Sequence, residues 1–193
     1  MIVCTEQAQM EAELVGGLLG CPSCRAVLGP WGHARERVLR CLAGDRWLRP
    51  RRARCRSCAG THVLLPDMAL LRRRDEVPVI GAAIEAKVAG EGHRPIAARL
   101  GVHADTVRGW LRRFARQAER IRAHFTRCAV ALDPEIGPVM PAGSGVADAL
   151  EAIAVAVRAW VLRFGPGDLW RIASVLSGGV LLGNTSSLLA TVR

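Results

Sequence analysis

Four of the seven cysteines form two Cys-x-x-Cys pairs, and this spacing is the clearest sign of chemistry in the chain. Cys21 and Cys24 make the first pair, and Cys55 and Cys58 make the second, with 30 residues between them. Each tight turn directs two sulfurs at one point, so two such turns on adjacent hairpins complete a tetrahedral thiolate cage. Thiolates favour zinc over magnesium or calcium. Because four thiolates leave no position for a catalytic water, we expect one structural Zn²⁺.

The alternatives to the cage are a redox dithiol and a set of buried thiols. A redox dithiol or a set of buried thiols would explain one pair, but not two matched pairs in one basic segment. His62 lies four residues after Cys58 and could also serve as a ligand, although four cysteines suffice. We expect Cys4, Cys41 and Cys128 to be small buried hydrophobic residues.

Residues 93–112 have the residue types and spacing of a helix-turn-helix. Ala97 is the small residue at which the two helices would cross, and Gly101 permits the turn between them. Val107 and Trp110 are the apolar residues that would dock the second helix on the first. The alternative is that short helices simply pack together here without binding DNA.

In a helix-turn-helix, the N-terminal end of the second helix enters the major groove. Arg108 is the candidate for base contact, because a guanidinium can bond both N7 and O6 of guanine. Arg112, Arg113 and Arg116 lie further along, where we expect phosphate contacts. The other residues expected to face DNA are His103, Ala104, Asp105 and Thr106.

A second group of arginines surrounds the second cysteine pair. Arg52, Arg54 and Arg56 alternate along the sequence, so on a strand they would share one face. A phosphate-contacting edge and a solvated face both fit this pattern, and the choice stays open.

Charge is concentrated in the middle of the chain. The 193 residues carry a net charge of +10, and 26 of the 27 basic residues are arginine. Residues 20–127 carry 23 basic and nine acidic side chains, whereas the segments on either side are slightly acidic. A field of this sign favours a polyanionic partner, with a solvated basic surface as the alternative. Half of the residues are apolar, which excludes a disordered polymer.

These motifs require a particular order of elements, and the expected fold class is mainly α with a small β zinc ribbon. Residues 79–89 would form the first helix of a trihelical unit. The expected divisions are a helical lead-in (1–20), an N-terminal zinc ribbon (21–66), a trihelical helix-turn-helix domain (77–127), a Pro- and Gly-rich linker (132–145), and a C-terminal helical hairpin with a tail (146–193).

The second helix of the motif is expected to continue well beyond Phe114. Apolar residues recur in alternating steps of four and three as far as Phe125, which defines a narrow seam. The seam would either join two copies in a homodimer or pack on the C-terminal helices of the same chain, and we prefer the second.

In the C-terminal hairpin, the larger residues from Val146 to Phe164 would form the apolar face, and Asp168 would cap the next helix. The hairpin would cover the DNA-binding module or form an oligomer contact.

Four segments follow one another along the chain in the order CPSC, RRARCRSCAGTH, LLP and IAARLGVHADTVRGWLRRF. This order resembles the zinc-ribbon and helix-turn-helix front end of bacterial insertion-sequence transposases. It is more closely similar to a small family found chiefly in high-GC bacteria and near mobile elements. Over residues 20–127 the resemblance implies that the four paired cysteines hold zinc and that the helix starting near His103 reads DNA. Two departures are Arg25 and Ala59, which stand where such cysteine turns often carry glycine.

The acidic residues argue against an enzyme. A transposase or nuclease needs carboxylates gathered on a sheet to hold two metal ions, whereas the acids after the helix-turn-helix fall on expected helices or in the linker. The resemblance therefore stops short of an acidic catalytic domain. We expect a sequence-specific double-stranded DNA-binding protein, either a transposition accessory factor with a transposase partner or a transcriptional regulator. The alternatives are a partial transposase or recombinase and a zinc-bearing RNA-binding or interaction protein.

The ends of the sequence bear on where the protein works. The first residues lack the basic start and apolar run of a secretory signal. The uncharged run at 172–190 contains several glycine and polar residues, so we expect no membrane span. A cytoplasmic, nucleoid-associated protein is expected.

Overall fold

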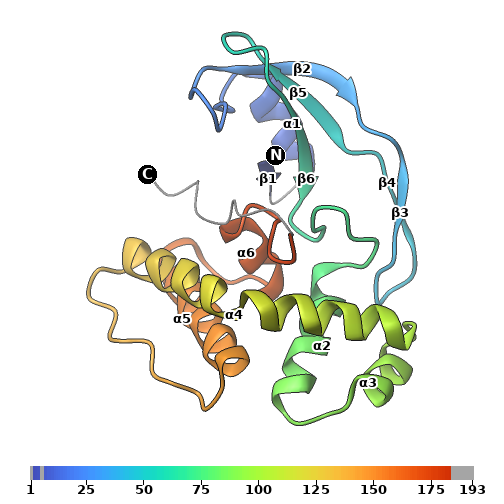
Figure 1. Cartoon of the computed structure of the whole chain (residues 1–193). Helices are drawn as coiled ribbons and strands as arrows, with labels where there is room; N and C mark the ends of the chain where they lie inside the picture. The colour runs from blue at the N-terminus through green and yellow to red at the C-terminus, as the bar shows by residue number, and fades with distance from the viewer. Residues whose placement is uncertain (1, 5–6, 184–193) are drawn as a thin grey trace.

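The computed structural model of the chain describes residues 2–4 and 7–183 and combines helices with a small sheet (Figure 1). The strands are β1 (Ile2–Cys4), β2 (Leu28–His33), β3 (Arg37–Leu39), β4 (Arg46–Leu48), β5 (Arg51–Cys55) and β6 (Thr61–Pro66). The helices are α1 (Gln7–Val15), α2 (Val77–Val88), α3 (His93–Leu100), α4 (Ala104–Leu132), α5 (Gly145–Phe164) and α6 (Leu169–Leu176). The sheet lies at one end of the molecule and the helices from α2 onward at the other.

The main sheet has the strand order β1-β6-β5-β2 and is antiparallel except for β1, which pairs with β6 in parallel. The expected helical lead-in is therefore helical only over α1, and its first residues add a strand to the sheet. Residues 46–55 divide into β4 and β5, which belong to different sheets. Pro50 stands at the break, and proline has no amide hydrogen to donate to a strand ladder.

The three helices α2, α3 and α4 follow one another with short turns. Helix α2 begins two residues earlier than the expected 79–89 and ends one residue earlier. Helix α3 ends at Gly101, which has the left-handed conformation (φ 63°, ψ 28°) that favours glycine. Ala97, Val107 and Trp110 are buried in one core with α2.

Helix α4 is 29 residues long and carries its apolar seam into the interior of the chain. Phe114, Ile121 and Phe125 are at most 1% exposed and belong to a core cluster that includes residues of α5 and α6. The seam therefore packs against helices of the same chain, which is the interpretation preferred from the sequence.

Helix α5 buries most of the face expected from the sequence, except Phe164, and it buries neighbouring alanines as well. Its buried residues are mainly alanines, together with Ile153 and Val157, while Phe164 is 58% exposed. Small side chains let α5 lie close along α4, while the larger Trp160 and Val161 are partly buried against the same core. Residues 133–144 form neither helix nor strand. Asp168 caps α6 as expected, since its Oδ1 accepts a hydrogen bond from the Arg171 amide (2.9 Å).

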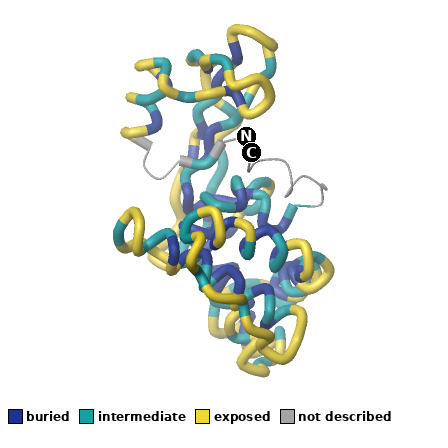
Figure 2. Tube along the Cα trace, turned by 90° about the vertical axis from the view of Figure 1, so that its left-hand side faces the viewer, coloured by how far each residue is buried: buried dark blue, intermediate teal, exposed yellow. Residues whose placement is uncertain are grey.

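Helix α6 docks on α2 through Trp170. A Cβ atom at Gly81 would lie 2.1 Å from the Trp170 ring, so only glycine allows this approach. The indole Nε1 donates to Glu85 Oε1 over 2.7 Å. Figure 2 shows runs of buried residues in the sheet and in the helices, and these form separate core clusters.

No helix among the described residues has both the length and the apolar character that crossing a membrane would require. Residues 184–193, which include most of the expected tail, lie outside the part that the structure describes.

Candidate metal centre and nucleic-acid interface

The two cysteine pairs meet, as predicted. They lie beside the start of β2 and the end of β5. The sulfurs of Cys21, Cys24, Cys55 and Cys58 all lie within 4.8 Å of one another. Sγ of Cys21 is 3.7 Å from that of Cys58, and Sγ of Cys24 is 3.4 Å from that of Cys55. Four ligands about 2.3 Å from a central ion lie about 3.8 Å apart at the corners of a tetrahedron, whereas a disulfide needs about 2.05 Å. The cluster is therefore a fit for one tetrahedral metal ion.

The two turns that carry the cysteines have matching backbones. The Cys21 amide donates to Ala26 O (2.8 Å), and the Cys55 amide donates to the residue at the same offset, Gly60 (2.9 Å). The residue after each second cysteine is left-handed, with φ 61° at Arg25 and φ 58° at Ala59. Both turns thus keep the shape that glycine normally provides at this position, at the cost of some backbone strain.

The turns also aim amide groups at the first sulfur of each pair. The amides of Ser57 and Cys58 both donate to Cys55 Sγ over 3.4 Å. The Cys58 amide is the main cause of the lowered pKa of Cys55. Hydrogen bonds of this kind favour the thiolate, which is the form that binds metal.

The pKa values of Cys21 and Cys58 move in opposite directions. Burial raises the pKa of Cys21, but hydrogen bonds from the amides of Ser23 and Cys24 outweigh it and bring the pKa to about 5. The Gly60 amide lowers the pKa of Cys58, but the three other cysteine sulfurs raise it to about 11. Several thiolates crowded together repel the last negative charge, and a bound cation is what relieves this repulsion.

The remaining cysteines and His62 lie around or away from this cluster. His62 Nε2 is 3.4 Å from Cys21 Sγ, so the imidazole neighbours one sulfur of the four-cysteine group. Cys128 is buried, with its Sγ 3.6 Å from a histidine nitrogen of α4, and Cys41 is half-buried. The side chain of Cys4 lies outside the described part of the chain.

The start of α4 is exposed and strongly polar. His103 is its N-cap, and its Nδ1 accepts a hydrogen bond from the Asp105 amide (3.3 Å). Asp105 Oδ1 in turn lies 2.9 Å from Arg108 Nη2, with both side chains more than half exposed. Ala104 and Thr106 are half-buried at the side of this turn.

The other arginines predicted to contact DNA fall in two separate places. Arg112 and Arg116 are exposed on α4, while Arg113 is half-buried and donates to Gly109 O (3.3 Å). On β5, Arg52 is half-buried with its Nη2 3.5 Å from Thr61 Oγ1, and Arg54 is exposed. The structure thus brings the α4 group together on one helix but places the β5 group on the sheet.

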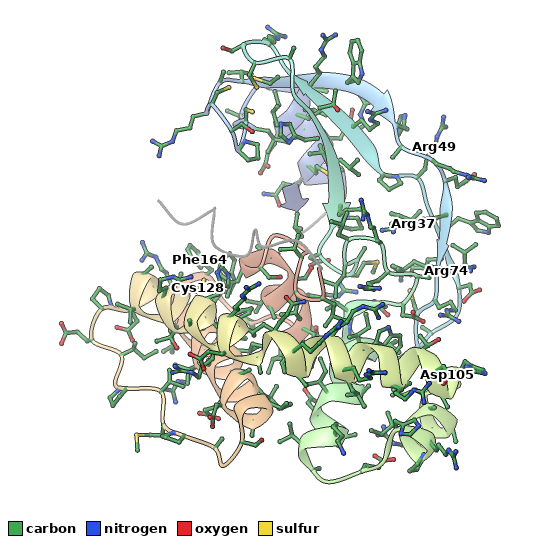
Figure 3. The ribbon with its side chains drawn as sticks, in the orientation of Figure 1. Arg37, Arg49, Arg74, Asp105, Cys128 and Phe164 are labelled. Atoms are coloured by element: carbon green, nitrogen blue, oxygen red, sulfur yellow. The ribbon has the colours of Figure 1, made fainter. Side chains whose placement is uncertain are left out.

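Arginines that the sequence did not single out lie between these two places. Arg37 Nη1 donates to Arg73 O (3.2 Å), and Arg73 Nη2 donates to Leu182 O (2.8 Å). Burial lowers the pKa of both side chains, and the charge of Arg113 lowers that of Arg73 further. In Figure 3, basic residues labelled at 49, 37 and 74 follow one edge of the molecule from the sheet down to Asp105 on α4. These two contacts join residues that are 36 and 109 positions apart, so no local sequence pattern could have indicated them.

Comparison with known proteins gives one family match. Residues 21–110 match the model of a family described as a domain of unknown function (DUF6431). The match runs from the first cysteine of the metal cluster to Trp110 in the second turn of α4. No curated protein and no solved structure matches the chain. The likeness to insertion-sequence transposases therefore stays a prediction from the sequence motifs, and the chain's established similarity is to this family model.

Proposed function

We propose that this protein binds specific sites on double-stranded DNA, using α3 and α4 as a helix-turn-helix and the four-cysteine centre as a structural zinc site. The observation that carries the proposal is the exposed start of α4. It presents Arg108, Arg112 and Arg116 to solvent on the side opposite the buried Val107 and Phe114.

The packing of α3 against α4 supports this reading. The turn between the two helices is only three residues long and is formed by Gly101, Val102 and His103. Buried apolar residues on both sides of the turn fix the angle between the helices, which leaves the first turns of α4 free to enter a groove. In that arrangement Arg108 would reach a guanine edge.

The ion pair between Asp105 and Arg108 bears on how DNA would be read. Without DNA, the carboxylate holds the guanidinium near the N-terminus of α4. A guanine with two acceptors competes for that guanidinium, and a carboxylate can accept a hydrogen bond from cytosine N4. The pair would therefore exchange a bond within the protein for bonds to neighbouring bases.

The zinc ion would act in folding and not in a reaction. Four thiolates fill a tetrahedral site, so a bound ion has no open position for substrate. The core of the sheet end is small and consists mainly of Met10, Leu14, Leu28 and Leu64. A small core of this kind gains much of its stability from a metal that ties its turns together.

The protein's role would be recognition, in transposition or in transcription and near the nucleoid. The test begins with selection of bound sequences from a random duplex pool, followed by affinity measurements on the selected and a scrambled duplex. Arg108→Ala should weaken the selected duplex by about 5- to 150-fold and the scrambled one much less. Arg127→Ala, which removes an equal charge from an exposed residue near the other end of α4, is the matched control. Equal losses on both duplexes would refute base reading by Arg108.

A further inference from the structure

A pocket of about 380 Å³ opens on the sheet beside the second cysteine turn. Its volume lies within the range of small-molecule sites. The residues that line it are Gly29, Pro30, Trp31, Arg54, Cys55, Arg56 and Ala59. The lining contains two cations, one large aromatic ring and no carboxylate, so it suits an anionic ligand with a flat ring.

The aromatic wall of this pocket is set by an irregularity in β2. Pro30 pairs with Ala53, but His33 pairs with Arg51, so β2 has one residue more than β5 between these pairs. Such a bulge turns a side chain away from its regular direction, and Gly32 beside it has the left-handed φ of 71°. As a result Trp31 is 48% exposed, although an indole is among the most favourable side chains to bury.

Arg54 lies against this ring, and Arg56 lines the pocket beside Gly29. The guanidinium carbon of Arg54 lies 4.6 Å from the centroid of the Trp31 ring. Arg56 Nε would lie 3.5 Å from a Cβ at Gly29, so the glycine leaves room for the guanidinium. Neither arginine forms an ion pair with any carboxylate among the described residues.

We infer that this pocket binds one unpaired base of single-stranded DNA, with the base against Trp31 and the adjoining phosphates on Arg54 and Arg56. Base stacking on an aromatic ring beside a basic groove is the general way in which proteins hold single strands. Because both arginines would hold phosphates and no side-chain amide or carboxylate lines the pocket, we expect little preference among bases. The site is separate from α4 and goes beyond the proposed duplex recognition.

The test uses the full-length, zinc-loaded protein and a short fluorescent oligothymidylate. Trp31→Ala should weaken binding by about 5- to 150-fold, the effect of losing one stacked base, and Trp31→Phe should keep most of the affinity. Trp47→Ala is the matched control, because Trp47 is 74% exposed on β4 and does not line the pocket. The same variants are measured on the selected duplex, for which Trp31→Ala should lose much less affinity, and this separates the inference from the proposed duplex binding.

A second measurement guards against a variant that fails to fold. Tryptophan emission should be quenched when the oligonucleotide binds, and Trp31→Phe should lose that part of the quenching while retaining affinity. The inference is overturned if Trp31→Ala and Trp47→Ala lose affinity equally, or if neither does. Displacement by thymidine monophosphate at concentrations close to those of the oligonucleotide would assign the pocket to a free nucleotide instead. Tighter binding of oligouridylate would overturn the assignment to DNA.

Discussion

Ala59 offers a substitution whose effect on the metal centre can be calculated from its backbone. Its φ of 58° is left-handed, and this conformation costs a residue with a Cβ about 1–2 kcal/mol. Ala59→Gly removes that strain but gives the unfolded chain more freedom, which costs about 0.4–1 kcal/mol. Because Ala59 is exposed, its methyl group adds little burial. The midpoints of the two ranges leave a net gain of about 0.8 kcal/mol in the free energy of unfolding.

The same gain should appear in metal affinity, because zinc binding and folding of these turns are coupled. Competition with a chelator should show zinc bound about 2- to 5-fold more tightly by Ala59→Gly than by the parent chain. Arg72→Gly is the control, since Arg72 has the same φ of 58° but lies in the loop before α2. It should raise the melting temperature without changing zinc affinity. Weaker zinc binding by Ala59→Gly, or an equal increase in the control, would refute the strained-turn explanation.

Three further predictions concern packing, metal binding and DNA binding. Gly81→Ala should lower the free energy of unfolding by about 1–3 kcal/mol in a urea titration, because its Cβ would overlap the Trp170 ring; an unchanged midpoint would show that the indole can move aside. Cys55→Ser should release the metal and abolish hydrogen-exchange protection in β5, and one tightly held zinc per chain in this variant would contradict the four-thiolate centre. Arg112→Ala should weaken all duplexes similarly and reduce the slope of log K against log salt by about 1, whereas a loss confined to one sequence would contradict phosphate contact.

The metal cluster could be predicted from the sequence because its geometry is mostly local. Two residues between cysteines suffice to define each turn, and the prediction that all four sulfurs meet is confirmed. Even the departures at Arg25 and Ala59 were informative, since both residues adopt the left-handed backbone that glycine would have adopted. The pattern of thiolates favours zinc, but sulfur positions alone do not distinguish it from other metals that prefer thiolate.

Features that depend on contacts between distant segments could not be predicted in the same way. The parallel pairing of β1 with β6 joins the start of the chain to residues 64–66. The exposure of Trp31 depends on the register between β2 and β5, although its place between Pro30 and Gly32 was an available sign that it is not a core residue. The buried alanines of α5 could not be predicted from apolar size, because close helix packing selects small side chains.

The most direct test of the central claim is methylation interference on the selected duplex. Methylation of guanine N7 blocks the major-groove atom that an arginine would bond. The account predicts at least one guanine at which methylation prevents binding of the parent protein but has no further effect on Arg108→Ala. If no guanine in the bound site shows interference, or if both proteins respond alike at every position, α4 does not read DNA through Arg108.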